Sequence, residues 1–307
     1  MERERLEQIL NNFPDKKIIV VGDVMLDEFT WGEVKRISPE APVPVVEVVR
    51  ETQQLGGSAN VVANIKALGG NPVTIAITGQ DAAAECLRLL YRGLQIDSSC
   101  LIADDRQTTI KTRIIANNQQ VVRTDREERK PLSSKLNKTL ETHFLDALPG
   151  SAAVIVSDYD KGVVNRELLA AILPKAQSAG VPVFLDPKVH HADYYKPTTL
   201  VTPNLGEAEL LSGKRIRDLS SLEEAGRLLL SRFECPYILI TRGWEGMSLF
   251  EGDSVHHLPA AAREVFDVVG AGDTVIATLT MAASSGASME EAAHIANTAG
   301  GIVVGKV

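Results

Sequence analysis

Hydrophobic residues along this chain follow two patterns, short β-branched runs and longer amphipathic stretches. The short runs are typical of strands buried on both faces. The longer stretches have helical spacing; Val61, Ile65 and Leu68 share one face of a helix that ends at Gly69-Gly70. This alternation predicts a parallel sheet with helices on both faces. The other predicted elements are strands at 18–21, 73–77, 153–156, 183–185, 200–202 and 237–240, and helices at 81–92, 134–147, 164–179, 220–233 and 272–285.

Two segments lack helical spacing and predict strands outside this alternation. Residues 28–50 carry three prolines and then a β-rich run at 45–49. Residues 108–124 have the pattern of a hairpin that turns at Asn117-Asn118. They predict a small second sheet, which could cover a site or pair with another subunit; surface elaboration is the alternative. We therefore predict one domain over residues 1–307, with lid segments inserted at about 28–50 and 108–124.

Composition narrows the classes of function. The 307 residues are 44% hydrophobic and carry a net charge of −8, which argues against nucleic acid or an acidic membrane as the main partner. A local basic pocket for a phosphorylated metabolite is compatible with this charge. Three cysteines without CxxC spacing are typical of a reducing compartment. The charged N-terminus lacks a signal peptide and no run is long enough to span a membrane, so we expect a cytoplasmic protein.

Residues 267–273, Asp-Val-Val-Gly-Ala-Gly-Asp, are the most informative stretch of the chain. They follow a β-like segment at 264–266 and precede an apolar helix. Two glycines and an alanine expose backbone N–H groups at a helix start, where the helix dipole favours anions. Asp273 lies on the same first turn. A phosphate cradle beside a potential base is what transfer of a phosphoryl group to an alcohol requires.

Two glycine patterns in the chain resemble known nucleotide-binding motifs but do not match them. Gly270-Ala-Gly272 is followed by Val275 where the dinucleotide fingerprint requires a third glycine. Residues 300–306 nearly match a Walker A loop, but Val307 stands where a hydroxyl should reach Mg²⁺, and no helix is predicted to follow.

Polar residues near the first strand are candidates for binding a sugar. Asp23 and Asp27 follow the strand at 18–21, where ligands bind in open α/β sheets, and could accept hydrogen bonds from hydroxyl groups. A turn with a capping Asp is an equal alternative. Gly56-Gly57 and Asn60 open a helix, so the backbone could approach a polyol closely; a glycine loop with a cap explains them as well.

Other strand ends carry candidates for phosphate and metal. Lys161 and Lys188 could both face an anion, although a lone lysine is usually solvated. Asn204 and Glu207 are spaced to share one helix face and could hold a hydrated Mg²⁺; a capping box is the alternative. Residues 241–246 could touch nucleotide phosphates or form a hairpin turn.

These motifs, in this order, resemble the ribokinase-like (PfkB) sugar kinase family over essentially the whole chain. Both family signatures are present, the Gly-Gly stretch at 56–70 and the stretch at 267–273. The resemblance implies a three-layer α/β/α sandwich with a mostly parallel central sheet and a small β-sheet lid. It also implies ATP and Mg²⁺ as cofactors, a sugar phosphate as substrate, and a homodimer joined through the lid strands.

The resemblance implies roles for individual residues. Asp273 matches the catalytic base, beside an anion hole of Gly270, Ala271 and Gly272. The remaining candidates are Asp23, Asp27, Gly56, Gly57 and Asn60 for the sugar, Lys161, Lys188 and, mainly on charge, Arg106 for its phosphate, Asn204, Thr241, Arg242, Gly243 and Gly246 for the nucleotide, and Asn204 with Glu207 for Mg²⁺.

Within the family, the chain is most similar to kinases of D-glycero-β-D-manno-heptose 7-phosphate. The likeness rests on residues 21–27, 157–159, 186–188 and 202–205, and most of all on residues 36–46 in the predicted lid. It implies phosphorylation of the anomeric hydroxyl to give heptose 1,7-bisphosphate, a precursor of ADP-heptose for lipopolysaccharide. The alternatives are a family kinase for ribose, a fructose phosphate or a nucleoside, and a binding protein without turnover.

Overall fold

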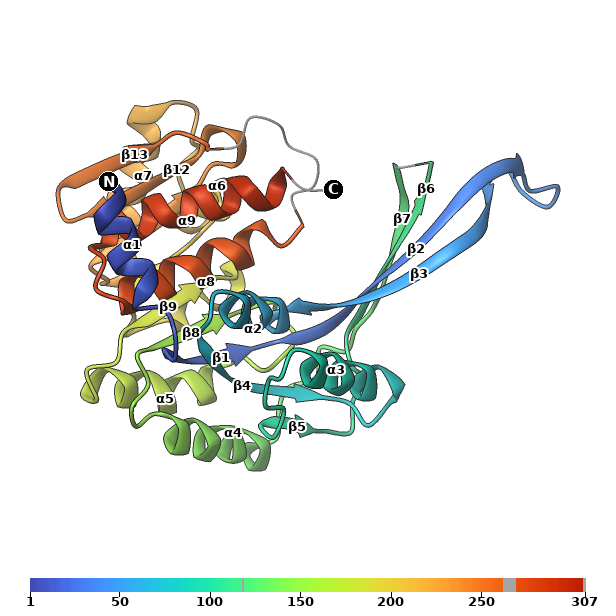
Figure 1. The fold of residues 1–307 in the computed structure, drawn as a ribbon, viewed down its shortest axis with the longest axis horizontal. Coiled ribbons are helices and arrows are strands. Elements are labelled where there is room, and N and C mark those ends of the chain that lie inside the picture. The colour runs from blue at the N-terminus through green and yellow to red at the C-terminus, as the bar shows by residue number, and fades with distance from the viewer. Residues whose placement is uncertain (118, 262–268, 306–307) are drawn as a thin grey trace.

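The central sheet of the computed structural model, which describes residues 1–117, 119–261 and 269–305, contains nine strands (Figure 1). Their order is β13-β12-β11-β10-β9-β8-β1-β4-β5; β12 is antiparallel to both of its neighbours, β11 and β13, and the other pairs are parallel. All six predicted strands are present. The nine are β1 (Lys17–Gly22), β4 (Asn71–Thr78), β5 (Leu101–Ala103), β8 (Ala153–Ser157), β9 (Val183–Asp186), β10 (Leu200–Val201), β11 (Tyr237–Thr241), β12 (Met247–Glu251) and β13 (Ser254–Leu258).

Helices cover both faces of this sheet, because successive side chains of its strands point to opposite sides. Ile18 and Val20 belong to one hydrophobic core, and Ile19 and Val21 to the other. The resulting three layers confirm the predicted α/β fold. The helices that pack in the first core are α1 (Arg3–Asn11), α2 (Ser58–Ala67), α3 (Ala82–Gly93), α8 (Ala271–Ser284) and α9 (Met289–Val304). The helices that pack in the second core are α4 (Ser134–Ala147), α5 (Arg166–Ser178), α6 (Leu205–Ser212) and α7 (Leu219–Phe233).

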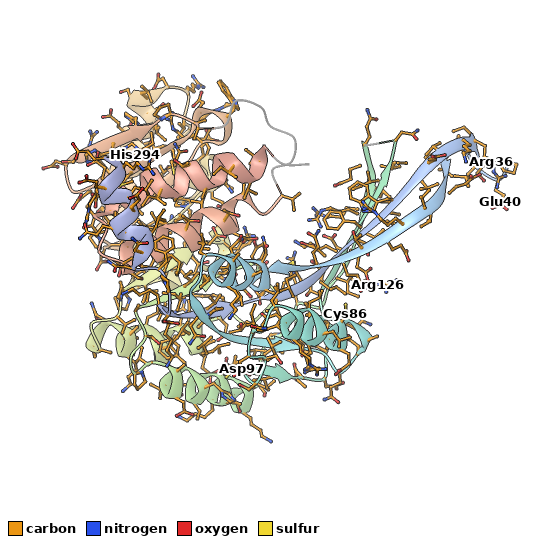
Figure 2. All side chains as sticks on the ribbon, in the orientation of Figure 1. Arg36, Glu40, Cys86, Asp97, Arg126 and His294 are labelled. Atoms are coloured by element: carbon orange, nitrogen blue, oxygen red, sulfur yellow. The ribbon has the colours of Figure 1, made fainter. Side chains whose placement is uncertain are left out.

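A second sheet forms the lid, in the order β3-β2-β6-β7. It consists of β2 (Val24–Ile37), β3 (Pro44–Gly57), β6 (Ile110–Ala116) and β7 (Gln119–Arg126). Strands β2 and β3 are longer than predicted and carry their tip, near Arg36 and Glu40, away from the body (Figures 1 and 2). The predicted hairpin at 108–124 is confirmed. Asn117 has the positive φ of a turn, 52°, while Asn118 lies outside the described residues.

The parallel strands bring several predicted site residues to one edge of the sheet. Asp23 follows β1, residues 158–161 follow β8, and Asn204 lies just beyond β10, where it bridges to Thr241 at the end of β11. Strand β2 leaves this same edge, so the lid lies beside it. Segment 264–267, including the predicted strand and Asp267, lies outside the described residues. No helix in the described part of the chain is long and apolar enough to cross a membrane.

Candidate active site

A small cavity of about 120 Å³ lies between the lid and the start of α8, and we call it the acceptor cavity. Asp273 lies in it and is 5% exposed. Its Oδ1 accepts a hydrogen bond from the Tyr159 hydroxyl at 2.7 Å, and its Oδ2 accepts one from Nδ2 of Asn60 at 2.8 Å. The lining residues are Met25, Asp27, Gly57, Asn60, Lys111, Arg113, Tyr159, Val269, Gly270 and Asp273.

Burial sets the ionisation of Asp273. It raises the pKa of this carboxyl to about 6, although the hydrogen bonds from Tyr159 and Asn60 lower it. A carboxyl with such a pKa is ionised at neutral pH and still basic enough to take a proton. Asp273 therefore has the burial, the ionisation and the position of a general base.

The N-terminus of α8 is open to an anion. Gly270 precedes the helix with φ 75°, and as the N-cap residue it supplies no side chain to cap the first-turn N–H groups. A Cβ on Gly270 would lie 2.7 Å from Nδ2 of Asn60, and one on Gly272 would meet nothing within 4 Å. Gly270 is thus required for close packing against α2, while the backbone at Gly272 is free to approach a ligand.

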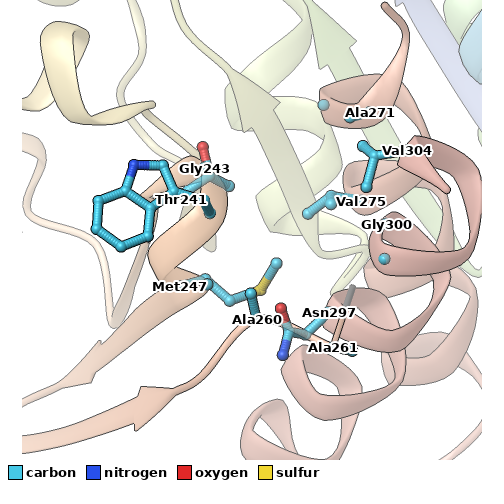
Figure 3. Close-up of a pocket in the computed structure, with 14 residues that line it drawn as sticks. Thr241, Gly243, Met247, Ala260, Ala261, Ala271, Val275, Asn297, Gly300 and Val304 are labelled. Atoms are coloured by element: carbon cyan, nitrogen blue, oxygen red, sulfur yellow. The ribbon is translucent and has the colours of Figure 1, made fainter. Parts of the chain in front are cut away.

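A larger cavity of about 630 Å³ lies on the other side of this helix end, and we call it the donor cavity (Figure 3). Its walls come from the β11–β12 connection, residues 260–261, and helices α8 and α9. Ala271 and Gly272 line the donor cavity, whereas Gly270 and Asp273 line the acceptor cavity. The first turn of α8 therefore separates two cavities and presents N–H groups between them.

Of the predicted nucleotide residues, Thr241, Gly243 and Gly246 line the donor cavity. Arg242 is not part of its lining, and the guanidinium pairs with Glu245 at 3.3 Å. Trp244, within the predicted segment 241–246, also lines this cavity. Sequence reasoning missed the remaining lining residues, which come from several distant segments. They are Met247, Ala260, Ala261, Val275, Asn297, Gly300, Gly301 and Val304.

The near-Walker stretch at 300–306 begins inside helix α9, which runs from Met289 to Val304. Residues 300–304 are therefore helical, and Gly300 and Gly301 line the donor cavity. Their missing side chains leave room for a ligand beside the helix.

Lid residues add charge to the acceptor cavity. Asp27 pairs with Arg113 at 2.9 Å, so its carboxylate is already neutralised by a lid cation. Lys111 lines the same cavity, and among the described residues none forms an ion pair with it. Burial lowers the pKa of Lys111. The sequence pattern did not single out Lys111 or Arg113, because their position depends on the parallel register of β2 and β6, which aligns Asp27 with Lys111.

Asp23, predicted to bind sugar, instead holds a loop. It is 2% exposed, and its carboxylate accepts backbone N–H bonds from Tyr159, Lys161 and Val163 at 3.0, 3.1 and 2.9 Å. Burial raises the pKa of Asp23 to about 6, and these bonds lower it. Its role here is to fix the loop that carries Tyr159.

Two of the cations predicted to bind phosphate have other partners. Lys161 is 9% exposed and its Nζ pairs with Glu127 at 2.6 Å. The Arg106 guanidinium pairs with Asp104 at 2.7 Å. Neither cation lines the acceptor cavity, so this placement does not favour the phosphate role that we predicted for them.

The Asn204 region forms the capping box that we considered as the alternative. Oδ1 of Asn204 accepts from Glu207 N at 2.9 Å, and Oε2 of Glu207 accepts from Asn204 N at 3.1 Å. Oε1 of Glu207 pairs with Lys188 at 2.9 Å. No cluster of three or more His, Cys, Asp or Glu side chains suited to a metal occurs within the described ranges. Amide and carboxylate oxygens can each accept a second hydrogen bond, so these residues are compatible with water molecules of a hydrated Mg²⁺ that is held mainly by phosphates.

A sequence model of the pfkB family carbohydrate kinases matches residues 15–307. The chain belongs to this family. The resemblance predicted from the two glycine signatures is confirmed, and ATP is the phosphoryl donor of pfkB kinases.

Curated relatives of this pfkB chain include two proteins named bifunctional protein HldE. The one from Paramagnetospirillum magneticum is 43% identical over 306 residues, 99% of this chain and 62% of that protein. The one from Pelobacter propionicus is 43% identical over 310 residues, 100% of this chain and 63% of that protein. The chain thus spans less than two thirds of the length of these relatives.

Solved structures share the fold at low sequence identity. Phosphofructokinase-2 from Escherichia coli in complex with potassium has a TM-score of 0.80 at 18% identity, over 95% of this chain and 93% of that chain. Arabidopsis thaliana ribokinase complexed with ribose and ATP has a TM-score of 0.73 at 18% identity, over 95% of this chain and 93% of that chain. These likenesses support the ribokinase-like architecture of the two sheets.

Proposed function

We propose that this chain transfers the γ-phosphoryl group of ATP to the anomeric hydroxyl of D-glycero-β-D-manno-heptose 7-phosphate, giving the 1,7-bisphosphate used to make ADP-heptose. The observation that carries the proposal is the first turn of α8, which lines both cavities and places Asp273 in the acceptor cavity. Family membership, the HldE relatives and the lid segment 36–46 support this choice of substrate.

In this proposal, Asp273 takes the proton of the sugar hydroxyl as its oxygen attacks the γ-phosphorus. The bond from that phosphorus to the β–γ bridging oxygen breaks, and ADP leaves from the donor cavity. N–H groups at 270–272 stabilise the negative charge that develops on the transferred group. Asn204 and Glu207 would hold a hydrated Mg²⁺, which neutralises phosphate charge when bound.

We also propose that Lys111 binds the phosphate already present on the sugar. It is a cation in the acceptor cavity without a carboxylate partner among the described residues, whereas Lys161 and Arg106 are paired elsewhere. Lys188 pairs with Glu207 at 2.9 Å and does not line the acceptor cavity. An unpaired, partly buried ammonium group gains most from a phosphate partner.

A further proposal is a homodimer joined through the lid. Both outer strands of the lid, β3 and β7, have an unpaired edge within the described part of the chain. They expose apolar side chains, Val48 and Val49 on β3 and Val121 and Val122 on β7. A second copy would cover these edges and side chains.

The test of the proposed function is ADP release from MgATP with the heptose 7-phosphate, with ribose and with fructose 6-phosphate. Rapid release with the heptose phosphate alone is the expected result, and the Asp273→Asn variant should release little. Release with another sugar alone would keep the kinase chemistry but overturn the substrate. No release with any of the three sugars would overturn the proposal for this chain.

A further inference from the structure

Tyr159 lies at the centre of the candidate active site, although sequence reasoning gave it no role. Its hydroxyl donates to Oδ1 of Asp273 at 2.7 Å. Nζ of Lys111 and Nζ of Lys188 lie 5.6 and 5.8 Å from the centre of its ring. The ring therefore stands between the acceptor cavity and the loop after β9, and its polar end reaches the proposed base.

The backbone fixes Tyr159 independently of its hydroxyl. The N–H of Tyr159 donates to Oδ2 of Asp23 at 3.0 Å, and two more N–H groups of the same loop bind that carboxylate. Asp23 directly follows β1 in the middle of the sheet. The hydroxyl is thus delivered to Asp273 by a loop anchored to the rigid core.

We propose that Tyr159 is a positioning residue, whose hydroxyl orients the Asp273 carboxylate and stabilises the ionised form that takes the sugar's proton. This inference rests on the proposed function, because it takes Asp273 to be the base. A donor to a carboxylate favours its charged form, and here it opposes the burial that raises the pKa of Asp273. Tyr159 keeps its own proton, since burial and the Asp273 charge raise its pKa well above the ordinary value.

Other groups around Asp273 act without a direct hydrogen bond, apart from Asn60. The carboxylates of Asp27 and Asp186 oppose the ionisation of Asp273, and the ammonium group of Lys111 favours it. Among the described residues, only Tyr159 and Asn60 donate to its carboxylate, so loss of the Tyr159 hydroxyl leaves one donor. The groups facing Asp273 are Asn60 on α2, Asp27 on β2, Lys111 and Arg113 on β6, Tyr159 after β8 and Asp186 at the end of β9.

The test measures the pKa of Asp273 without any substrate, in the full chain. Protein labelled with ¹³C at aspartate side-chain carboxyls is titrated by NMR, and the resonance missing in Asp273→Asn identifies Asp273. Tyr159→Phe should raise the titration midpoint by about one pH unit, because a hydrogen bond to a charged group is lost. The acid limb of kcat/KM for the sugar should move in the same direction.

Tyr195→Phe is the matched control. Its hydroxyl also donates to a carboxylate on the loop after β8, that of Asp158 at 2.6 Å, but does not touch Asp273. This variant should leave the Asp273 midpoint unchanged. An unchanged midpoint in Tyr159→Phe, or an equal shift in Tyr195→Phe, would overturn the inference.

A second variant keeps the test decisive where Tyr159→Phe does not fold. Site-specific 3-fluorotyrosine at position 159 retains the shape of the ring but has a more acidic hydroxyl, hence a stronger donor. The midpoint of Asp273 should then fall, and a rise would contradict the inference. Because the titration needs no sugar, its outcome stays separate from a failure of the kinase assay.

Discussion

Asp273 combines two properties that oppose each other, since a base must be both ionised and buried. Burial raises its pKa to about 6, above that of an ordinary aspartate. The pKa of Asp273 is higher in the folded than in the unfolded protein, so the protonated side chain contributes stability to the fold. This contribution is fully present below the unfolded pKa and is lost as pH rises through about 6. At neutral pH the ionised side chain therefore costs stability, as functional groups in active sites often do.

Asp273→Asn should consequently lose turnover but gain stability. We expect ADP release to fall by at least about a thousandfold. The free energy of unfolding should rise by up to about 3 kcal/mol at neutral pH, because no charge remains to be buried. Urea unfolding at several pH values would check this, since the gain should vanish in acid. Equal stability at neutral pH would contradict the cost assigned to the charge.

Lys111 tests how the substrate phosphate is bound. Lys111→Met keeps an unbranched apolar side chain of nearly the same length and removes the charge, so KM for the heptose 7-phosphate should rise about tenfold or more while KM for MgATP stays the same. Steady-state kinetics with each substrate varied would measure both. Lys161→Met is the control, because Lys161 is paired with Glu127. A larger KM effect in the control would return the phosphate role to Lys161.

At the scale of elements, the loop after β8 depends on one buried carboxylate. Asp23→Ala would leave the N–H groups of Tyr159, Lys161 and Val163 without their acceptor. We expect a loss of about 2–4 kcal/mol in the free energy of unfolding, and lower turnover because the loop carries Tyr159. Chemical denaturation measures the first. Asp193→Ala, at an exposed aspartate, should change neither property, and a comparable loss there would contradict the argument.

Elements with one dominant pattern were predictable from the sequence. The six buried strands are β-branched runs, and α4 was predicted with the bounds it has, residues 134–147. Helix α9 was missed because its residues are mostly small, although its capping box of Ser288 and Glu291 was a usable signal. Strands β12 and β13 were missed because neither contains a run of β-branched residues and β13 is mostly polar.

The site was predictable only where one local motif carries the chemistry. The turn at 270–273 follows from glycines at a helix start, and its role beside an anion stays a prediction. Lys111 and Tyr159 reach the same cavity from the lid and from the loop after β8, and no local pattern brings them together. The partners that occupy Lys161 and Arg106, namely Glu127 and Asp104, likewise depend on tertiary packing rather than on composition.

At the scale of the whole molecule, the lid extends away from the body of the protein (Figure 1), and both of its outer strands expose apolar side chains. Val49 on β3 is 74% exposed. Two such strands paired across a twofold axis would bury these side chains and close the open edges of the sheet. The strands of the lid would then both line the acceptor cavity and form the contact between subunits.

Val49→Asp should therefore separate the proposed dimer. A charge within an apolar contact between strands would have to be buried without a partner, so light scattering should report the mass of one chain where the parent protein has the mass of two. Leu210→Asp is the matched control, because Leu210 is 69% exposed but lies on α6 in the body of the protein. It should leave the mass unchanged. Dissociation by Leu210→Asp but not by Val49→Asp would move the contact from the lid to the body, and the lid would then serve the acceptor cavity alone.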